Sequence, residues 1–315
     1  MRVIFMGTPA FAVQTLQKCI ESHEVVAVFT QPDRPKGRGN KLTPSEVKIV
    51  AEKHNLLILQ PEKIRKDDWA QRIRALEPDV IVVVAFGQLL SQEILDIPKY
   101  GCINVHASLL PKYRGAAPIN WAIAKGETQS GVTTMMMDAG LDTGDMLLKS
   151  VIDIDRDMTA EVLHDHLATM GADLLIETLS RLEKGDLKPE KQVNQESCYA
   201  PMMNKDTAKI NWALSAVDIH NHVRAFNPWP VAHTQLNEII LKVYKTETVE
   251  GTLEDFGQGE NQLEGTIIKT DKNGIYVKTG HGVICIKELQ FGSGKRMSTQ
   301  AFLLGNTVAL GTVLV

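Results

Sequence analysis

Residues 80–86 read VIVVVAF, and this stretch decides the fold of the chain because all seven side chains are apolar. A strand that is covered by helices on both faces has such a continuous apolar run, whereas a strand with one solvated face alternates apolar and polar residues. The run therefore predicts a central strand of a parallel sheet.

Strand and helix patterns alternate on both sides of this run. Strands are expected at Val3–Met6, Val25–Phe29, Leu56–Leu59 and Gly101–His106, and helices at Ala10–Ile20, Ser45–His54 and Asp67–Leu76. This alternation predicts βαβ units and hence an α/β fold with a doubly wound, Rossmann-like sheet. Further strands are expected at Gly131–Met137 and Met146–Ile154, followed by a long helix at Thr159–Leu182 that Thr159 caps.

The pattern changes in the second half of the chain. Residues 185–206 are polar and irregular, and after one helix at Ala216–Phe226 short strands alternate with turns. The expected strands are Ala232–Leu236, Ile239–Tyr244, Gly265–Thr270, Ile275–Lys278 and Val283–Leu289. Strands of this number and length predict a small antiparallel β-barrel, of the size of oligonucleotide-binding (OB-like) barrels. The expected organisation is an α/β domain at 1–184, a linker at 185–206 and a barrel domain at 207–315.

Length and composition fit a two-domain globular protein of the cytoplasm. The chain has 315 residues, of which 43% are hydrophobic and 23% charged, and it has no run of 18 apolar residues that could span a membrane. An apolar strand begins almost at the first residue, so no signal or transit peptide is expected. The four cysteines are scattered singly, which favours reduced thiols over disulfides or a zinc site. The net charge of −4 argues against broad nucleic-acid binding, so any RNA contact must come from local patches.

An amide and an imidazole stand at the end of the expected strand Gly101–His106. Alternate side chains of a strand share a face, so Asn104 and His106 point the same way at the carboxyl edge, where open α/β sheets place their chemistry. An amide donor beside an imidazole suits a carbonyl oxygen that becomes negative during acyl transfer. For an isolated Asn-x-His pair, a turn cap and a structural histidine are the commoner interpretation.

A glycine-flanked acidic loop, Gly140–Asp145, lies between two expected strands. Aspartate and glycine are common in simple turns, and that is one interpretation. The other places one carboxylate against His106, where it favours the charged imidazolium and lets the histidine donate and relay a proton. The sequence alone does not decide whether the loop reaches the histidine.

Two other motifs invite functions that their spacing does not support. Gly7-Thr8-Pro9 follows the first strand but lacks the glycine pattern of a dinucleotide site, and Pro9 suits the first turn of a helix. The pairs His164/His166 and His220/His222 are spaced i,i+2 in helices, which puts the imidazoles on different faces. No dinucleotide and no metal are therefore expected.

The segment Gln31–Lys41 carries four positive charges and one negative, with two prolines and two glycines. One interpretation is a solvated loop. The segment is, however, long for a connection between a strand and a helix, and such loops are usually functional or disordered. As a flexible basic finger beside a strand-edge site, it would hold phosphates of a polyanionic substrate.

The stretches at 104–111 (NVHASLLP) and 113–119 (YRGAAPI) together resemble the signature of the 10-formyltetrahydrofolate-dependent formyltransferases. The strand at Gly131-Val132-Thr133 and the loop Gly140–Asp145 continue that pattern at the expected distance. Three further stretches are similar to the family members that act on initiator Met-tRNA: 5–9 (FMGTP), the loop Gln31–Lys41, and 224–230 (RAFNPWP). The resemblance extends from residue 2 to about residue 315.

This resemblance implies a formyltransferase that uses 10-formyltetrahydrofolate, needs no metal and formylates the methionine of initiator Met-tRNA for translation initiation. The matching positions imply a catalytic trio of Asn104, His106 and Asp142. The implied folate-binding positions are Ser108, Leu109, Leu110 and Pro111, then Phe86, Gly87, Gln88 and Leu90, and finally Met137, Asp138 and Gly140. Contacts with the tRNA acceptor end are implied for Arg34, Lys36, Arg38 and Lys41, with Arg38 at the critical position.

One position departs from the family pattern, and two other functions stay open. Met202 stands where the family often carries a linker lysine near the RNA, and whether Lys205 replaces that lysine is open. A formyltransferase for a nucleotide-linked amino sugar would share the first domain but has no use for the basic loop. A non-catalytic RNA-binding protein would have no reason to hold the trio together. A monomer is expected.

Overall fold

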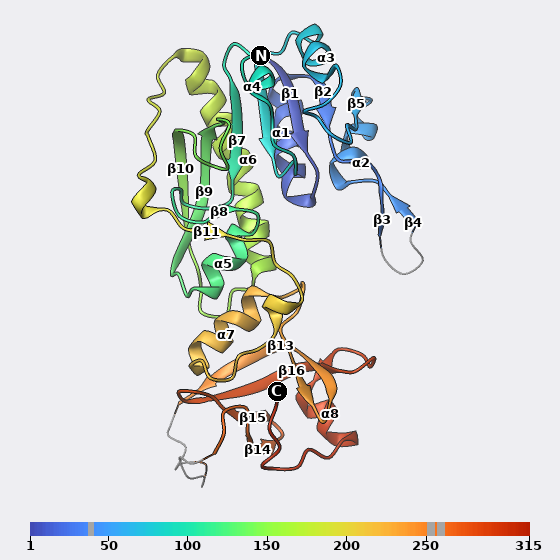
Figure 1. Cartoon of the computed structure of the whole chain (residues 1–315), viewed down its shortest axis with the longest axis vertical. Helices are drawn as coiled ribbons and strands as arrows, with labels where there is room; N and C mark the ends of the chain where they lie inside the picture. Colours follow the sequence, from blue (N-terminus) through green and yellow to red (C-terminus); the bar gives the residue numbers. More distant parts are fainter. Residues whose placement is uncertain (37–40, 251–255, 257–261) are drawn as a thin grey trace. The chain divides into compact units, whose positions relative to one another are not determined.

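The computed structural model describes residues 1–36, 41–250, 256 and 262–315, and its contacts divide the chain into two compact units (Figure 1). Unit 1 contains Met1–Pro118, Gln129–Asp153 and His164–Ala200; unit 2 contains Ile119–Thr128, Ile154–Leu163 and Pro201–Val315. Residues 185–200, expected as part of a linker, thus belong to unit 1. Within the described ranges, no helix combines the length and the apolar character that a bilayer crossing requires.

The largest sheet among the described residues of unit 1 has seven strands in the order β10-β9-β7-β6-β1-β2-β5. Its strands are β1 (Arg2–Gly7), β2 (Glu24–Phe29), β5 (Ile58–Leu59), β6 (Val80–Val84), β7 (Cys102–His106), β9 (Gln129–Met136) and β10 (Met146–Asp153). β5, β2, β1, β6 and β7 pair in parallel, which confirms the predicted Rossmann-like sheet. β9 and β10 run antiparallel, because the short loop between them cannot make the long crossover of a parallel pair.

Helices cover both faces of this sheet, as the apolar run at 80–86 predicts. They are α1 (Val13–Ser22), α2 (Glu46–Lys53), α3 (Trp69–Ala75), α4 (Gln92–Leu95) and α6 (Ala160–Lys184). Ile4 of β1 and Ile81 of β6 pack with Ile73 of α3 and Ile94 of α4 in one buried cluster. On the opposite face α6 packs closely on the sheet, since a Cβ at Gly171 would lie 2.9 Å from the Val105 side chain.

The basic segment Gln31–Lys41 differs from the expected flexible loop. β3 (Arg34–Lys36) and β4 (Lys41–Thr43) form a short antiparallel ribbon. Its base is held by Asp33, which accepts hydrogen bonds from Lys48 (2.7 Å) and Gln60 (2.8 Å), and these bonds lower the pKa of Asp33. Alternation was not visible in the sequence because each strand has only three residues.

Unit 2 contains the predicted antiparallel sheet, with strand order β12-β13-β16-β15-β14 and β17 beside β16. Its strands are β12 (His233–Leu236), β13 (Ile239–Val249), β14 (Ile267–Asp271), β15 (Gly274–Lys278), β16 (Val283–Phe291) and β17 (Met297–Ser298). Its helices are α7 (Ala216–Ala225), α8 (Thr299–Gly305) and α5 (Pro118–Ala124), of which all but the first residue belong to unit 2. The C-terminal residues join both edges of the sheet, because Val313 bridges Thr266 before β14 and Val315 exchanges two hydrogen bonds with Gln235 of β12. The sheet is thereby closed into a small barrel.

Acidification is expected to destabilise unit 2. Burial lowers the pKa of His220 and His222 below the ordinary value of 6.5. Between the folded and the unfolded pKa values, the unfolded chain therefore binds more protons than the folded unit. The free energy of unfolding should therefore fall as the pH drops from 6.5 towards the folded pKa values. Thermal unfolding at several pH values measures this, and His222→Phe, which keeps the stacking on Phe226, should reduce the slope. An unchanged slope would contradict the prediction.

Candidate active site

Asn104 and His106 lie at the carboxyl end of β7, on the same side of the strand, as the period of two predicts. Asn104 is half-buried and His106 is 6% exposed. The strand lies between β6 and β9 inside the sheet, so the main chain on both sides is held by neighbouring strands. The two side chains are thus carried by one of the most rigid parts of unit 1.

Both ring nitrogens of His106 face protein oxygens. Nε2 lies 2.9 Å from the carbonyl oxygen of Tyr113, and because a carbonyl only accepts, Nε2 carries the hydrogen of this bond. Nδ1 lies 3.7 Å from Oδ2 of Asp142. The acidic loop therefore reaches the histidine, which the sequence had left open, and Nδ1 is the nitrogen available for proton exchange.

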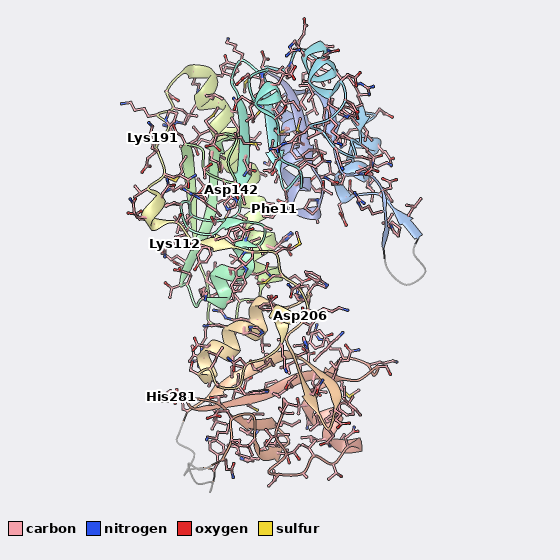
Figure 2. All side chains as sticks on the ribbon, in the orientation of Figure 1. Phe11, Lys112, Asp142, Lys191, Asp206 and His281 are labelled. Carbon is pink, nitrogen blue, oxygen red and sulfur yellow. The ribbon has the colours of Figure 1, made fainter. Side chains whose placement is uncertain are left out.

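Asp142 (labelled in Figure 2) lies in the loop between β9 and β10, with a side chain that is 14% exposed. Its Oδ2 accepts a hydrogen bond of 2.8 Å from the main-chain nitrogen of Gly115, and its Oδ1 lies 3.4 Å from Nδ2 of Asn104. Charge-assisted hydrogen bonds are usually about 2.7–2.9 Å long. The contacts with Asn104 and His106 are longer, so both groups keep hydrogen-bonding capacity for reacting atoms.

The shape of this loop depends on close main-chain approaches. Asp142 has a φ of 53°, in the left-handed region, and a Cβ at Gly144 would lie 1.8 Å from the carbonyl oxygen of Met136. Oδ1 of Asp138 accepts from the nitrogen of Gly140 (3.0 Å) and the hydroxyl of Thr143 (2.7 Å). Asp138 and Gly140, which the resemblance assigned to folate, therefore also determine where the Asp142 carboxylate lies.

The stretch Ser108–Pro111 forms a turn after β7. The Ser108 hydroxyl donates to the carbonyl of Lys112 at 2.6 Å, and Leu110 donates its main-chain N–H to the Thr133 hydroxyl at 3.1 Å. Ser108 and Leu110 are each 1% exposed, whereas Leu109 and Pro111 are half-buried. Leu109 and Pro111 are therefore the members of this stretch whose side chains reach the surface.

The stretch Phe86–Leu90 contains both buried and exposed residues. Phe86 and Leu90 are buried in the core cluster, where Met137 packs against them, and the Gln88 amide bonds Ile64 and Pro61. Gly87 is exposed. Leu89 is 47% exposed as well, and folate contacts of this stretch stay a prediction.

Thr8 and Gln31 hold that stretch in place. The Thr8 hydroxyl and the Gln31 amide each donate to the carbonyl of Phe86 at 3.1 Å. Gly7-Thr8-Pro9 thus has a structural task beside the site, and a Cβ at Gly7 would lie 2.7 Å from the Phe5 ring.

Of the basic candidates, Arg34 is exposed and lies 3.7 Å from Glu62. Lys36 and Lys41 pair their main chains across the β3–β4 ribbon. Arg38 lies outside the described residues. The structure thus places Arg34, Lys36 and Lys41 on the ribbon, apart from the interactions of the trio.

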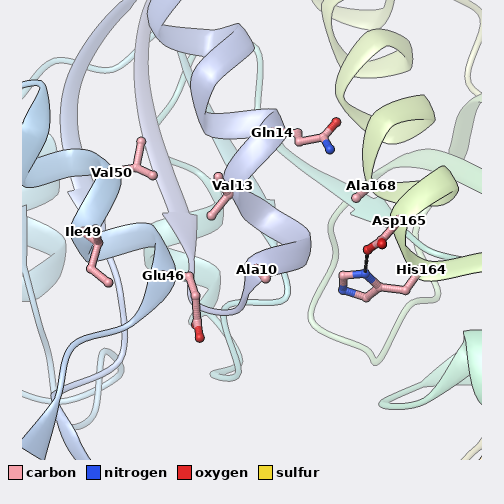
Figure 3. A pocket seen from close by; sticks show the side chains of 9 residues that line it. All are labelled: Ala10, Val13, Gln14, Glu46, Ile49, Val50, His164, Asp165 and Ala168. Carbon is pink, nitrogen blue, oxygen red and sulfur yellow. Dashed lines mark hydrogen bonds and ion pairs between the residues drawn. The ribbon is translucent and has the colours of Figure 1, made fainter. Parts of the chain in front are cut away.

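The histidine pairs are occupied by other partners. His164 bonds Asp165 at 2.9 Å, His220 bonds Thr246 at 3.1 Å, and His222 bonds the carbonyl of Ala208 at 3.2 Å. Among the described residues, no group of three or more His, Cys, Asp or Glu side chains is arranged to hold a metal ion. A cavity of about 410 Å³ between α1, α2 and α6 is lined mostly by apolar side chains and by His164 and Asp165, and it contains none of the predicted site residues (Figure 3).

Gln192 was not among the predicted residues. It lies in the irregular segment 185–200, donates two hydrogen bonds to main-chain oxygens of the Asp142 loop and accepts two from Arg114. A polar residue in an irregular segment carries no periodic signal, and nothing in the sequence marks its distant partners.

Two family models match the chain. The model described as formyl transferase matches residues 1–179, and the model described as formyl transferase, C-terminal domain, matches residues 202–307.

Proteins named methionyl-tRNA formyltransferase are similar to this chain over its whole length. That of Clostridium perfringens is 52% identical over 315 residues, with 100% of both chains covered. That of Trichlorobacter lovleyi is also 52% identical, with 100% of this chain and 97% of that protein covered.

Solved structures with a similar fold are more distant in sequence. The N-formyltransferase from Helicobacter canadensis, in complex with folinic acid and dTDP-3-aminofucose, has a TM-score of 0.66 at 21% identity and covers 91% of this chain and 98% of its own. HypX from Aquifex aeolicus in complex with tetrahydrofolic acid has a TM-score of 0.62 at 17% identity, with coverages of 99% and 50%. These likenesses concern the fold.

Proposed function

Because the chain belongs to the methionyl-tRNA formyltransferase family, we propose that it transfers the formyl group of 10-formyltetrahydrofolate to the α-amine of methionine on initiator Met-tRNA, which supplies formylmethionyl-tRNA for translation initiation. The observation that carries the proposal is the cluster of Asn104, His106 and Asp142 at the carboxyl end of β7. As a protein of translation, it is proposed to work in the cytoplasm. Its monomeric state stays a prediction.

The cluster suits formyl transfer because it combines donors with a carboxylate. The amide of Asn104 and a protonated Nδ1 of His106 donate to the formyl oxygen, which becomes negative as the amine nitrogen bonds to the formyl carbon. The Asp142 carboxylate lies 3.7 Å from Nδ1 of His106, on the side where that nitrogen donates. The amine proton passes through Asp142 and a water to N10 as the bond between N10 and the formyl carbon breaks.

The bound folate supplies an activated formyl carbon. The groups that fit its polar pterin ring are the main chain around exposed Gly87 and the loop at Asp138 and Gly140, and Leu109 and Pro111 are half-buried apolar residues. Main-chain donors and acceptors next to apolar surface are the usual composition of small-molecule sites. The Asp142 cluster needs no metal for oxyanion stabilisation and proton transfer.

Incubation with formyl-donor folate and charged initiator tRNA tests the proposal, with a nucleotide-linked amino sugar as the competing acceptor. Formylation of the methionyl-tRNA alone is expected. Formylation of the sugar alone would replace the proposal by the sugar enzyme, and RNA binding without transfer would replace it by a binding protein.

Arg38→Ala is expected to weaken the use of Met-tRNA without changing stability by more than about 0.5 kcal/mol. If Arg38 contacts a phosphate of the acceptor end, its loss should raise the KM for Met-tRNA and reduce the salt dependence of binding by roughly one phosphate contact. Steady-state kinetics at several salt concentrations measure both effects, with Arg72→Ala of α3 as the matched control. Equal losses with charged tRNA and with a small amine acceptor would instead place Arg38 in the shared active site.

A further inference from the structure

Gln192 connects the two loops that surround the Asp142 carboxylate. Its Nε2 donates to the carbonyl oxygens of Asp142 and Gly144, both at 2.8 Å. Its Oε1 accepts from Nε and Nη2 of Arg114 at 3.0 and 2.9 Å. All four contacts are of ordinary hydrogen-bond length, so the half-buried amide is fully used.

We propose that Gln192 is a positioning residue for catalysis, which holds Asp142 at the distance from His106 and Asn104 that formyl transfer requires. The proposal rests on the proposed function of the trio. Gln192 carries no charge and contacts neither Asn104 nor His106, so it acts through the geometry of the Asp142 loop.

The loop needs such support because its backbone is strained. Asp142 has a φ of 53°, in the left-handed region that residues with a side chain rarely adopt. Gly144, two residues on, passes too close to Met136 for a side chain. The side-chain amide of Gln192 donates its two N–H groups to the carbonyls on both sides of Thr143, which fixes the direction of the chain at this point.

The other end of Gln192 fixes the second loop. Arg114 precedes Gly115, whose N–H donates to Oδ2 of Asp142 at 2.8 Å. The contacts therefore close a ring that leads from the Asp142 main chain through Gln192, Arg114 and Gly115 to the Asp142 carboxylate. The position of the Asp142 carboxylate is therefore held by bonds to its own main chain and by a bond to its Oδ2.

The segment that carries Gln192 is itself held against the site. β11 (Tyr199–Ala200) pairs in parallel with β8 (Arg114–Gly115). A Cβ at Gly115 would lie 2.6 Å from the Tyr199 ring and 2.7 Å from the carbonyl oxygen of Ala200. Gln192 is therefore anchored along the same loop that it connects to Asp142.

Loss of this connection is expected to lower kcat by about 10- to 100-fold, because a displacement of about 1 Å at a catalytic group has effects of that order. The KM values for folate and Met-tRNA should change less than kcat, since Gln192 bonds the loop at Asp142 and Gly144 and not at the proposed folate positions Asp138 and Gly140.

Three variants separate positioning of Asp142 from simple anchoring of Arg114. Gln192→Glu keeps an acceptor for Arg114 but cannot donate to the carbonyls of Asp142 and Gly144, and Gln192→Ala loses both functions. Asn194→Ala is the matched control, since Asn194 accepts from Nη2 of Arg114 at 3.0 Å but does not contact the Asp142 loop. Reduced kcat in both Gln192 variants, with wild-type kcat in Asn194→Ala, supports the proposal.

Wild-type kcat in Gln192→Glu would overturn the proposal, as would raised KM values with unchanged kcat. Thermal unfolding checks that the isosteric Gln192→Glu chain is folded, which keeps the test valid if Gln192→Ala is unstable. Hydrogen exchange of the amides of residues 138–146 needs no substrate, and faster exchange in Gln192→Glu than in wild type is expected. A wild-type protein that does not formylate Met-tRNA refutes the proposed function, whereas unchanged exchange in that variant refutes the role of Gln192.

Discussion

His106→Gln is expected to lower kcat for Met-tRNA formylation by about 10²–10⁴-fold, the usual loss when a general acid–base group is removed. The imidazole provides the donor at Nδ1 beside Asp142. A glutamine amide donates but carries no positive charge, so the stabilisation of the oxyanion falls.

His106→Ala should lose activity as strongly and also lose stability. His106 is 6% exposed, and its Nε2 donates to the carbonyl of Tyr113. Truncation removes this hydrogen bond, which typically contributes about 0.5–1.5 kcal/mol.

Single-turnover formylation of Met-tRNA by the two variants, beside their thermal unfolding, measures both effects. Turnover close to wild type in a folded His106→Gln chain would remove His106 from the mechanism.

Asn104→Ala is expected to reduce kcat by about 10²–10³-fold, which corresponds to about 2.7–4 kcal/mol of transition-state stabilisation for one oxyanion donor. Nδ2 of Asn104 lies 3.4 Å from Asp142 in the absence of substrate, so the donor is directed into the site without a strong existing partner. The carbonyl oxygen gains negative charge only in the transition state, and the loss should therefore appear in kcat and not in the KM for folate.

Steady-state kinetics with both substrates varied give kcat and the two KM values for Asn104→Ala. A normal kcat with a raised KM for folate would make Asn104 a ground-state binding residue. The double variant Asn104→Ala/Gln192→Glu adds information, because non-additive losses are expected if both residues act on the Asp142 geometry.

Much of unit 1 was predictable because its signals are local. The run at 80–86 identified β6 as a central strand, and the alternation of Asn104 and His106 on β7 placed both side chains at one edge. Periodicity depends on backbone geometry within a few residues, so it can be recognised in the sequence without knowing which strands or helices pack against it. The same reasoning predicted the antiparallel strands of unit 2.

Short elements and polar contacts were not predictable in this way. β3 and β4 have three residues each, too few for a period to show. Phe86 and Leu90 matched pocket positions by resemblance, yet their side chains are in the core. Whether these side chains point into the core depends on residues such as Ile4 and Ile64, which lie far away in the sequence.

The sequence by itself determined the fold class, the strand that carries Asn104 and His106, and the family to which the chain belongs. Tertiary structure alone decided that the loop of Asp142, 36 positions after His106, brings its carboxylate to within 3.7 Å of the imidazole. It also decided that Gln192, from a segment expected as a linker, holds that loop. The physical reason is that periodic apolar residues encode local backbone geometry and burial, whereas a hydrogen bond between distant polar groups depends on the packed chain that brings them together.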